Sequence, residues 1–142
     1  MGRRSRFLFL FGLFLLISVG CRNSVTPPED DSMARMSKLA EMLMRSDGGP
    51  SGGIEGEAAF REFIAGHSDR IKRAVAVKDA GELLVCARDG QPVKLLFGKE
   101  CPKYEGRRIR AYEQSAVDGQ VWVVLGNVAE QIPEDKLNKL LK

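Results

Sequence analysis

The second half of the chain consists of short apolar runs that alternate with turn residues, and no other feature constrains the fold as strongly. Asp89-Gly90 and Gly126-Asn127 are pairs that close two-residue hairpins, and Val117-Asp118-Gly119 closes a longer loop. Apolar runs of this length between such turns are typical of antiparallel strands. The pattern predicts five strands, at residues 82–87, 92–98, 107–114, 120–125 and 128–132.

Three other segments carry apolar residues at helical spacing. The first covers residues 32–45, where Met36, Leu39 and Leu43 lie on one stripe. The second covers residues 57–65, and the third follows Pro133, a residue suited to the first position of a helix. Helices on one face of a strand meander make an α+β domain. We therefore predict an α+β fold with four or five antiparallel strands and short helices on one face.

The start of the chain is typical of an export signal. Three arginines within the first six residues precede an apolar stretch from residue 7 to about residue 19. A helix of about 13 residues rises only about 20 Å, well short of the ~30 Å hydrocarbon core of a membrane. We expect residues 1–20 to be a signal peptide rather than a membrane span.

The signal leads into a candidate lipid-attachment site. Gly20-Cys21 resembles the end of the bacterial lipoprotein box, whose cysteine receives a diacylglyceryl group. Ser18 stands where that box usually has an aliphatic residue, so simple secretion and an uncleaved anchor stay open as alternatives. We predict lipidation at Cys21, which would place an exported protein on the cell membrane or the outer membrane.

Two stretches of low complexity suggest how the mature chain is divided. Residues 22–31 are polar and contain Pro27-Pro28, and residues 47–56 hold five glycines. We predict a tether over residues 21–56, which includes the helix at 32–45 and the glycine-rich linker. A small domain should then occupy residues 57–142.

The charge of the chain argues against nucleic acid as a partner. The chain has 22 Lys and Arg against 19 Asp and Glu, and Arg3, Arg4 and Arg6 account for the whole net charge of +3. Once the signal is removed the protein is close to neutral, so the basic precursor carries no indication of a nucleic-acid partner.

Cys86 and Cys101 are an even pair in an exported protein, which is the context in which disulfides form. A hairpin turn at Asp89-Gly90 would place Cys86 opposite Val93, on the order of 25 Å from Cys101 along the strand. A disulfide requires the loop at 98–106 to fold back over the sheet. Otherwise Cys86 is a small buried hydrophobic residue.

No motif indicates a reaction, a cofactor or a metal. His67-Ser68-Asp69 are adjacent in the sequence, whereas a catalytic triad needs a spatial relay that neighbours on a loop rarely provide. The His, Cys and carboxylate residues do not have metal-ligand spacing. We expect no catalytic residue, no cofactor and no metal site.

The better functional candidate is a surface on two neighbouring strands. Pairing across the 115–119 loop would put Tyr112 opposite Trp122, with Arg108 and Arg110 on the same face. Arginine and aromatic residues are enriched at binding hot spots. The alternative is that Trp122 packs beneath a helix while the arginines are solvated. Nearby Lys99, Lys103 and Arg107 would favour anionic headgroups or a cell-wall polymer.

Five short motifs mark the last 60 or so residues: Leu83-Leu84-Val85, Arg88-Asp89-Gly90-Gln91-Pro92, Ala111-Tyr112-Glu113, Val123-Val124-Leu125-Gly126-Asn127-Val128 and Ile132-Pro133-Glu134. In these motifs the region resembles small planctomycete-type envelope lipoproteins, whose C-terminal part is similar to pseudopilin-like proteins with an Asp-Gly turn. Here Gly126-Asn127 stands where Asp-Gly is usual. The resemblance implies export and a small sheet domain, and it carries no catalytic residue.

These observations together favour a membrane-tethered envelope lipoprotein with a small, non-catalytic binding or scaffolding domain. Its partners would be the membrane, through the anchor at Cys21, and an envelope protein or cell-wall polymer. The first alternative is a secreted or anchored assembly subunit related to pseudopilins, and the second is a small envelope enzyme.

Overall fold

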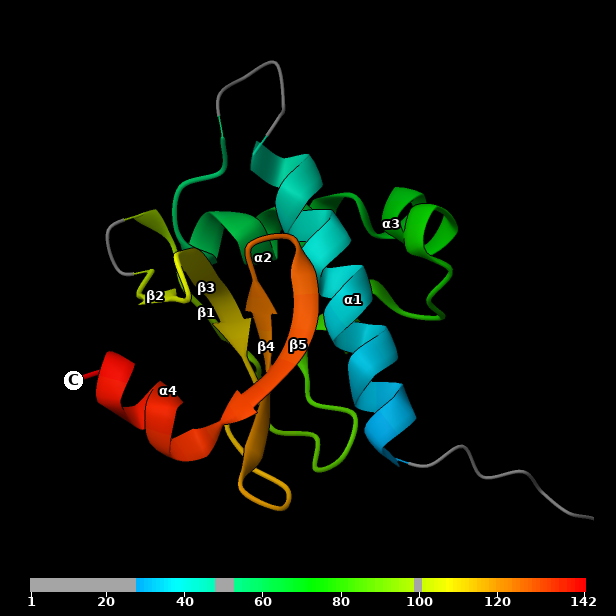
Figure 1. Ribbon diagram of the computed structural model, residues 1–142. Helices are drawn as coiled ribbons and strands as arrows, with labels where there is room; N and C mark the ends of the chain where they lie inside the picture. The colour runs from blue at the N-terminus through cyan, green and yellow to red at the C-terminus, as the bar shows by residue number, and fades with distance from the viewer. Residues whose placement is uncertain (1–27, 48–52, 99–100) are drawn as a thin grey trace, which may run out of the picture.

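The computed structural model describes residues 28–47, 53–98 and 101–142, with side chains from residue 31 onward. The chain is α+β, as the sequence predicts (Figure 1). The helical elements are α1 (Pro28–Asp47), α2 (Glu57–Gly66), α3 (Ser68–Val75), the 3₁₀ helix η1 (Ala80–Leu84) and α4 (Glu134–Leu140). The strands are β1 (Lys94–Leu95), β2 (Lys103–Tyr104), β3 (Arg107–Tyr112), β4 (Gln120–Leu125) and β5 (Val128–Pro133).

All strand pairs are antiparallel, and the strands follow the order β1-β3-β4-β5. β2 pairs with the first half of β3, and β1 pairs with the second half. The strands predicted at 107–114, 120–125 and 128–132 are confirmed as β3, β4 and β5. The strand predicted at 92–98 is reduced to the two residues of β1.

The strand predicted at 82–87 is wrong, because this segment begins as the 3₁₀ helix η1. The side chain of Asp79 accepts a hydrogen bond of 2.8 Å from the N–H of Gly81 and so caps the helix. Leu83 and Leu84 are both buried in that turn. Consecutive buried apolar residues suit a buried strand or a buried helical turn equally well, and the Asp79 cap favours the turn.

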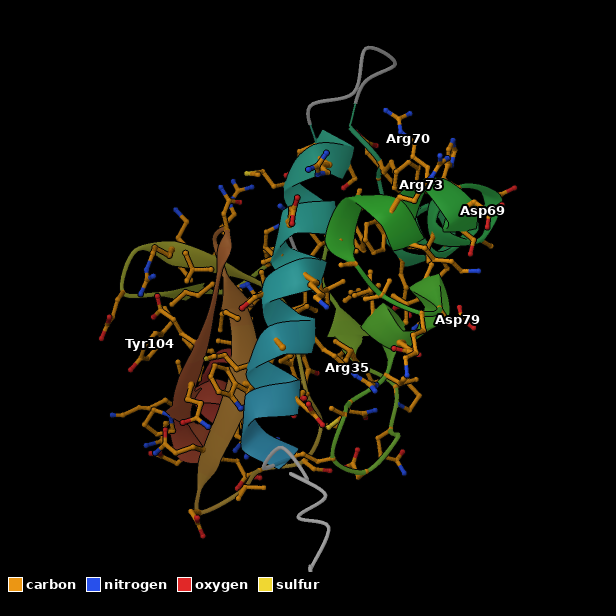
Figure 2. All side chains as sticks on the ribbon, turned by 90° about the vertical axis from the view of Figure 1, so that its right-hand side faces the viewer. Arg35, Asp69, Arg70, Arg73, Asp79 and Tyr104 are labelled. Carbon is orange, nitrogen blue, oxygen red and sulfur yellow. The ribbon has the colours of Figure 1, made fainter. Side chains whose placement is uncertain are left out.

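The long helix α1 belongs to the packed core. Met36, Leu39 and Leu43 are buried in one cluster with residues of η1, β3 and β4. Helix α1 contacts β4, β5 and η1 most extensively, and Figure 2 shows it between the sheet and α3. Residues 32–47, which the sequence assigned to the tether, are therefore part of the domain, and the boundary at residue 57 is corrected. The glycine-rich residues 48–52 lie outside the described residues.

Helix α3 was not predicted from the sequence. Its two buried apolar residues, Ile71 and Val75, are four positions apart, which is too short a pattern to identify a helix. The helix ends at Ala76, which adopts a left-handed conformation with φ of 51°. The Lys38 ammonium of α1 donates to the carbonyl of Ala76 at 3.2 Å, so α1 holds the end of α3 in place.

The sheet is covered on both faces rather than on one. Alternate residues of β4 point away from α1 and form a second cluster with Ile109 and Ile132. Leu137 of α4 is buried against this second cluster. Tyr104 of β2 packs there too, on the side of the sheet away from α1 (Figure 2).

Candidate functional site

A change of register between β3 and β4 divides the surface that the sequence predicted. Ile109 pairs with Leu125, whereas Ala111 pairs with Val124, so one extra residue, Arg110, is accommodated in β3. This irregularity is a β-bulge, and it alters which side chains of the two strands share a face. Simple alternation along β3 therefore fails from Arg110 onward.

Tyr112 lies opposite Val123, so its predicted pairing with Trp122 is wrong. Trp122 is only 8% exposed and packs with Ala111 and Val124 in the cluster beneath α1. Tyr112 is half-buried and packs in the cluster on the other face. The aromatic part of the predicted surface is thus divided between two core clusters, and the packing alternative for Trp122 is confirmed.

The predicted surface residues Arg108 and Arg110 lie in one cleft, and Arg107 lies there as well. Arg107, Arg108 and Arg110 all line an open cleft of about 880 Å³ at the end of the sheet where α1 ends. Figure 1 shows the end of α1 and the β4–β5 turn at this same end of the domain. Other parts of the lining come from α1, the segment before α2, the segments flanking β1 and β2, and the β4–β5 turn, and include Asp47, Ile54, Glu55, Phe97, Cys101 and Asn127.

Arg110 connects the sheet to the end of α1. Its guanidinium forms an ion pair of 2.7 Å with Asp47 and donates to the carbonyl of Leu43 at 3.4 Å. The Arg110 side chain is 12% exposed and Asp47 is 54% exposed, so the pair is at the edge of the core. A cation at the C-terminus of a helix interacts favourably with the helix dipole. Arg110 is therefore mainly a structural residue.

Arg107 is held by a carboxylate of β5. Its guanidinium donates two hydrogen bonds to Glu130, one of them at 2.8 Å, in the bidentate arrangement typical of strong arginine–carboxylate pairs. The hydrogen bond raises the pKa of Arg107 and lowers the pKa of Glu130. The pair crosses over β4 and fixes the edge of the cleft.

Arg108 differs from its two neighbours. It is exposed, and within the part of the chain that the structure describes it makes no ion pair. Glu55, on another part of the cleft wall, is likewise exposed and without an ion pair among the described residues. Among the described residues, the cleft therefore presents one positive and one negative group that make no ion pair.

The wall of the cleft also contains apolar surface. Phe97 is half-buried and its ring centroid lies 5.9 Å from that of the buried Phe60. Ile54 is packed against the same core cluster, and its backbone N–H donates to the carbonyl of Ser46 at 3.3 Å. These contacts of Phe97 and Ile54 with the core hold the wall of the cleft in place, so a ligand would bind to a largely preformed surface.

A second polar cluster lies at the other end of β3 and serves the fold. Arg88 forms an ion pair with Glu113, which is 1% exposed, and donates to the carbonyl of Ser115 at 2.8 Å. The Ser115 hydroxyl donates in turn to Asp89, and this hydrogen bond lowers the pKa of Asp89. The cluster fastens the loop at 87–90 to the loop at 114–117.

The loop at 87–90, which closes the hairpin predicted at Asp89-Gly90, has four residues rather than the predicted two. The N–H of Cys86 donates to the carbonyl of Gln91 at 2.8 Å, and the N–H of Gly90 donates to the carbonyl of Cys86 at 3.0 Å. Cys86 therefore lies opposite Gln91, and the predicted register with Val93 is wrong. Cys86 and Cys101 are not joined by a disulfide.

We expect the two thiols to react at very different rates. Cys86 is 2% exposed and burial raises the pKa of its thiol, whereas Cys101 is partly exposed and lines the cleft. Because the thiolate is the reactive form, iodoacetamide should modify Cys101 at least about tenfold faster than Cys86 in the native protein. Peptide mapping by mass spectrometry measures both rates, and in urea they should become similar. Equal rates in the folded protein would contradict the packing of Cys86.

His67 has a local structural role. Its Nδ1 lies 3.0 Å from the carbonyl of Phe63, and the two rings pack with centroids 4.8 Å apart. In the described parts of the chain, no three His, Cys, Asp or Glu side chains gather as a metal ion would require. None of the described helices has the length and apolar character needed to cross a membrane.

No protein-family model matches the chain, and no curated protein or solved structure shows significant similarity to it. The function is therefore inferred from the residues themselves.

Proposed function

We propose that the protein is a lipid-anchored envelope protein whose small α+β domain binds a charged partner in the arginine-lined cleft, without catalysing a reaction. The observation that carries the binding role is Arg108, an exposed arginine without an ion pair in the described structure, set between two paired arginines. An unpaired guanidinium can bind a carboxylate or phosphate with two parallel hydrogen bonds.

The anchoring role rests on the export signal and on Cys21, which lie outside the described residues. A lipoprotein anchor has more than one acyl chain, and each buried CH₂ contributes about 0.8 kcal/mol. That binding is far firmer than the marginal attachment of a single myristoyl chain.

Cys21→Ser should abolish anchoring, because serine lacks the thiol that accepts the lipid. We expect an unprocessed precursor or a soluble product in place of the membrane-bound form. Fractionation of cells and mass spectrometry of the N-terminal peptide measure this. Finding an unmodified Cys21 in mature wild-type protein would rule out the lipoprotein role.

Arg108→Glu should weaken capture of the partner. After crosslinking of intact membranes, we expect the variant to retain less than about a fifth of the wild-type crosslinked product, since the change replaces attraction by repulsion at the ligand. Arg70→Glu is the matched control, because Arg70 is an exposed arginine on α3 (Figure 2) and is not among the residues that line the cleft. Equal losses in both variants would indicate a general charge effect and not a binding site.

One feature favours the alternative of an assembly subunit related to pseudopilins. Within the described structure β5 is an edge strand that pairs only with β4. Edge strands can pair with a second chain. Val128, at the start of β5, is 53% exposed. An assembly subunit would form oligomers whose size increases with concentration, which sedimentation velocity would detect.

A further inference from the structure

The length of chain between the anchor and α1 limits how the domain can stand on a membrane. This inference rests on the proposed lipidation of Cys21. Only the six residues 22–27 separate Cys21 from the start of α1. Even when fully extended, the seven Cα–Cα steps from Cys21 to Pro28 span only about 25 Å. The start of α1 must therefore stay within about 25 Å of the membrane surface.

The cleft is at the far end of the same helix. Helix α1 has 20 residues, which corresponds to a rise of about 30 Å, and its last residue, Asp47, lines the cleft. Figure 1 shows the start of α1 at the same end of the domain as α4 and the β3–β4 loop, opposite the β4–β5 turn. To turn the domain over and press the cleft end down onto the lipid surface, the start of α1 would have to rise about 30 Å, which is more than the tether spans.

The charged residues of the cleft indicate the chemical class of its ligand. Arg108 would attract a carboxylate of the ligand, and Glu55 would attract an ammonium group. Phe97 would contact the apolar part of the ligand that lies between those charged groups. A purely anionic polymer would be repelled by Glu55. A volume of about 880 Å³ is within the range of pockets for small ligands, whereas protein partners generally require broad surfaces.

We propose that the cleft faces away from the anchoring membrane and binds a short peptide chain that carries both free carboxylate and free amino groups, as the peptide side branches of a bacterial cell wall do. The short reach of the tether disfavours the headgroups of the anchoring membrane as the ligand. The protein would thereby connect the membrane to the wall.

The binding test uses the full-length, detergent-purified protein and purified cell-wall sacculi in a co-sedimentation assay. We expect Arg108→Glu to weaken binding roughly tenfold, since one charge-assisted contact is lost. Glu55→Lys should weaken it as well, because the ammonium group loses its partner. Arg70→Glu should bind like wild type.

Three outcomes would overturn the proposal. A stronger affinity of Glu55→Lys would show that the ligand is a polyanion without amino groups. Binding of the wild-type protein to sacculi that does not respond to Arg108→Glu would place the contact outside the cleft. Tight binding of the unlipidated Cys21→Ser protein to vesicles of anionic phospholipid, lost in Arg108→Glu, would identify a lipid headgroup as the ligand.

The orientation is tested separately on vesicles that carry the lipidated protein. A fluorophore on Val117→Cys, in the β3–β4 loop, should transfer energy to acceptor-labelled lipids more efficiently than one on Asn127→Cys, at the cleft, both in a Cys101→Ser background. Equal or reversed transfer would refute the orientation. If the protein does not remain on the vesicles, the proposed anchoring itself fails, so the two failures are distinguishable.

Discussion

Trp122→Ala should destabilise the domain by about 3–5 kcal/mol, the usual cost of truncating a large buried aromatic residue. Trp122 is 8% exposed and packs beneath α1 with Ala111 and Val124. A loss of this size removes much of the stability of a small domain, whose total is commonly 5–15 kcal/mol. Thermal and urea unfolding of the protein measure the change. A Trp122→Ala melting temperature within a degree or two of wild type would show that Trp122 is exposed.

Two further variants test the same packing. Trp122→Phe should cost clearly less than Trp122→Ala, because phenylalanine keeps most of the buried aromatic volume and leaves a smaller cavity. Both variants also remove the indole Nε1, which is buried without a hydrogen-bond partner among the described residues. Arg108→Ala should change stability by no more than about 0.5 kcal/mol, as expected for an exposed residue with no ion pair. Arg110→Ala should cost more than Arg108→Ala, because Arg110 pairs with Asp47.

Arg88→Met should also be strongly destabilising, by about 3–5 kcal/mol, because it leaves the carboxylate of Glu113 buried and unpaired. Arg88 is 10% exposed and Glu113 is 1% exposed, so water cannot replace the missing partner. Urea unfolding at neutral pH measures the loss. An effect below about 1 kcal/mol would show that the pair is solvated in solution.

The double variant Arg88→Met with Glu113→Leu is the control. Removing both charges avoids the unpaired carboxylate, so it should recover most of the stability that Arg88→Met loses. Recovery should remain incomplete, because Arg88 also donates to the carbonyl of Ser115. A double variant no more stable than Arg88→Met alone would show that the hydrogen bond to the loop, rather than the charge pair, dominates.

The strands that the sequence predicted well are those with long, unambiguous local signals. β4 has an apolar run of five buried residues between Gly119 and Gly126, both with positive φ, and the structure confirms its bounds. The segment at 82–87 has a similar apolar composition, but its first three residues belong to the 3₁₀ helix η1, and only an isolated antiparallel bridge between Val85 and Pro92 follows. The Asp79 side chain caps η1 through its hydrogen bond with the N–H of Gly81, and apolar periodicity does not reveal a cap of this kind.

The candidate site was predicted in part. Arg108 and Arg110 were identified from the sequence, and both line the cleft. Arg107 was named only as added charge. Asp47 and Glu55 were assigned to the glycine-rich linker, because they reach the cleft from segments far away in the sequence. The predicted partners Tyr112 and Trp122 were separated by the bulge at Arg110, for which a run of alternating residues offers no signal.

The sequence by itself determined the α+β class, the three-strand meander of β3, β4 and β5, and the helices at 32–45 and 57–65, since apolar spacing and turn residues act locally. Tertiary structure decided the register of β3 against β4 and the placement of α1 on the sheet. It also decided which arginines have carboxylate partners. These features depend on contacts between residues distant in the chain, whose free energies emerge only when the whole core is packed at once.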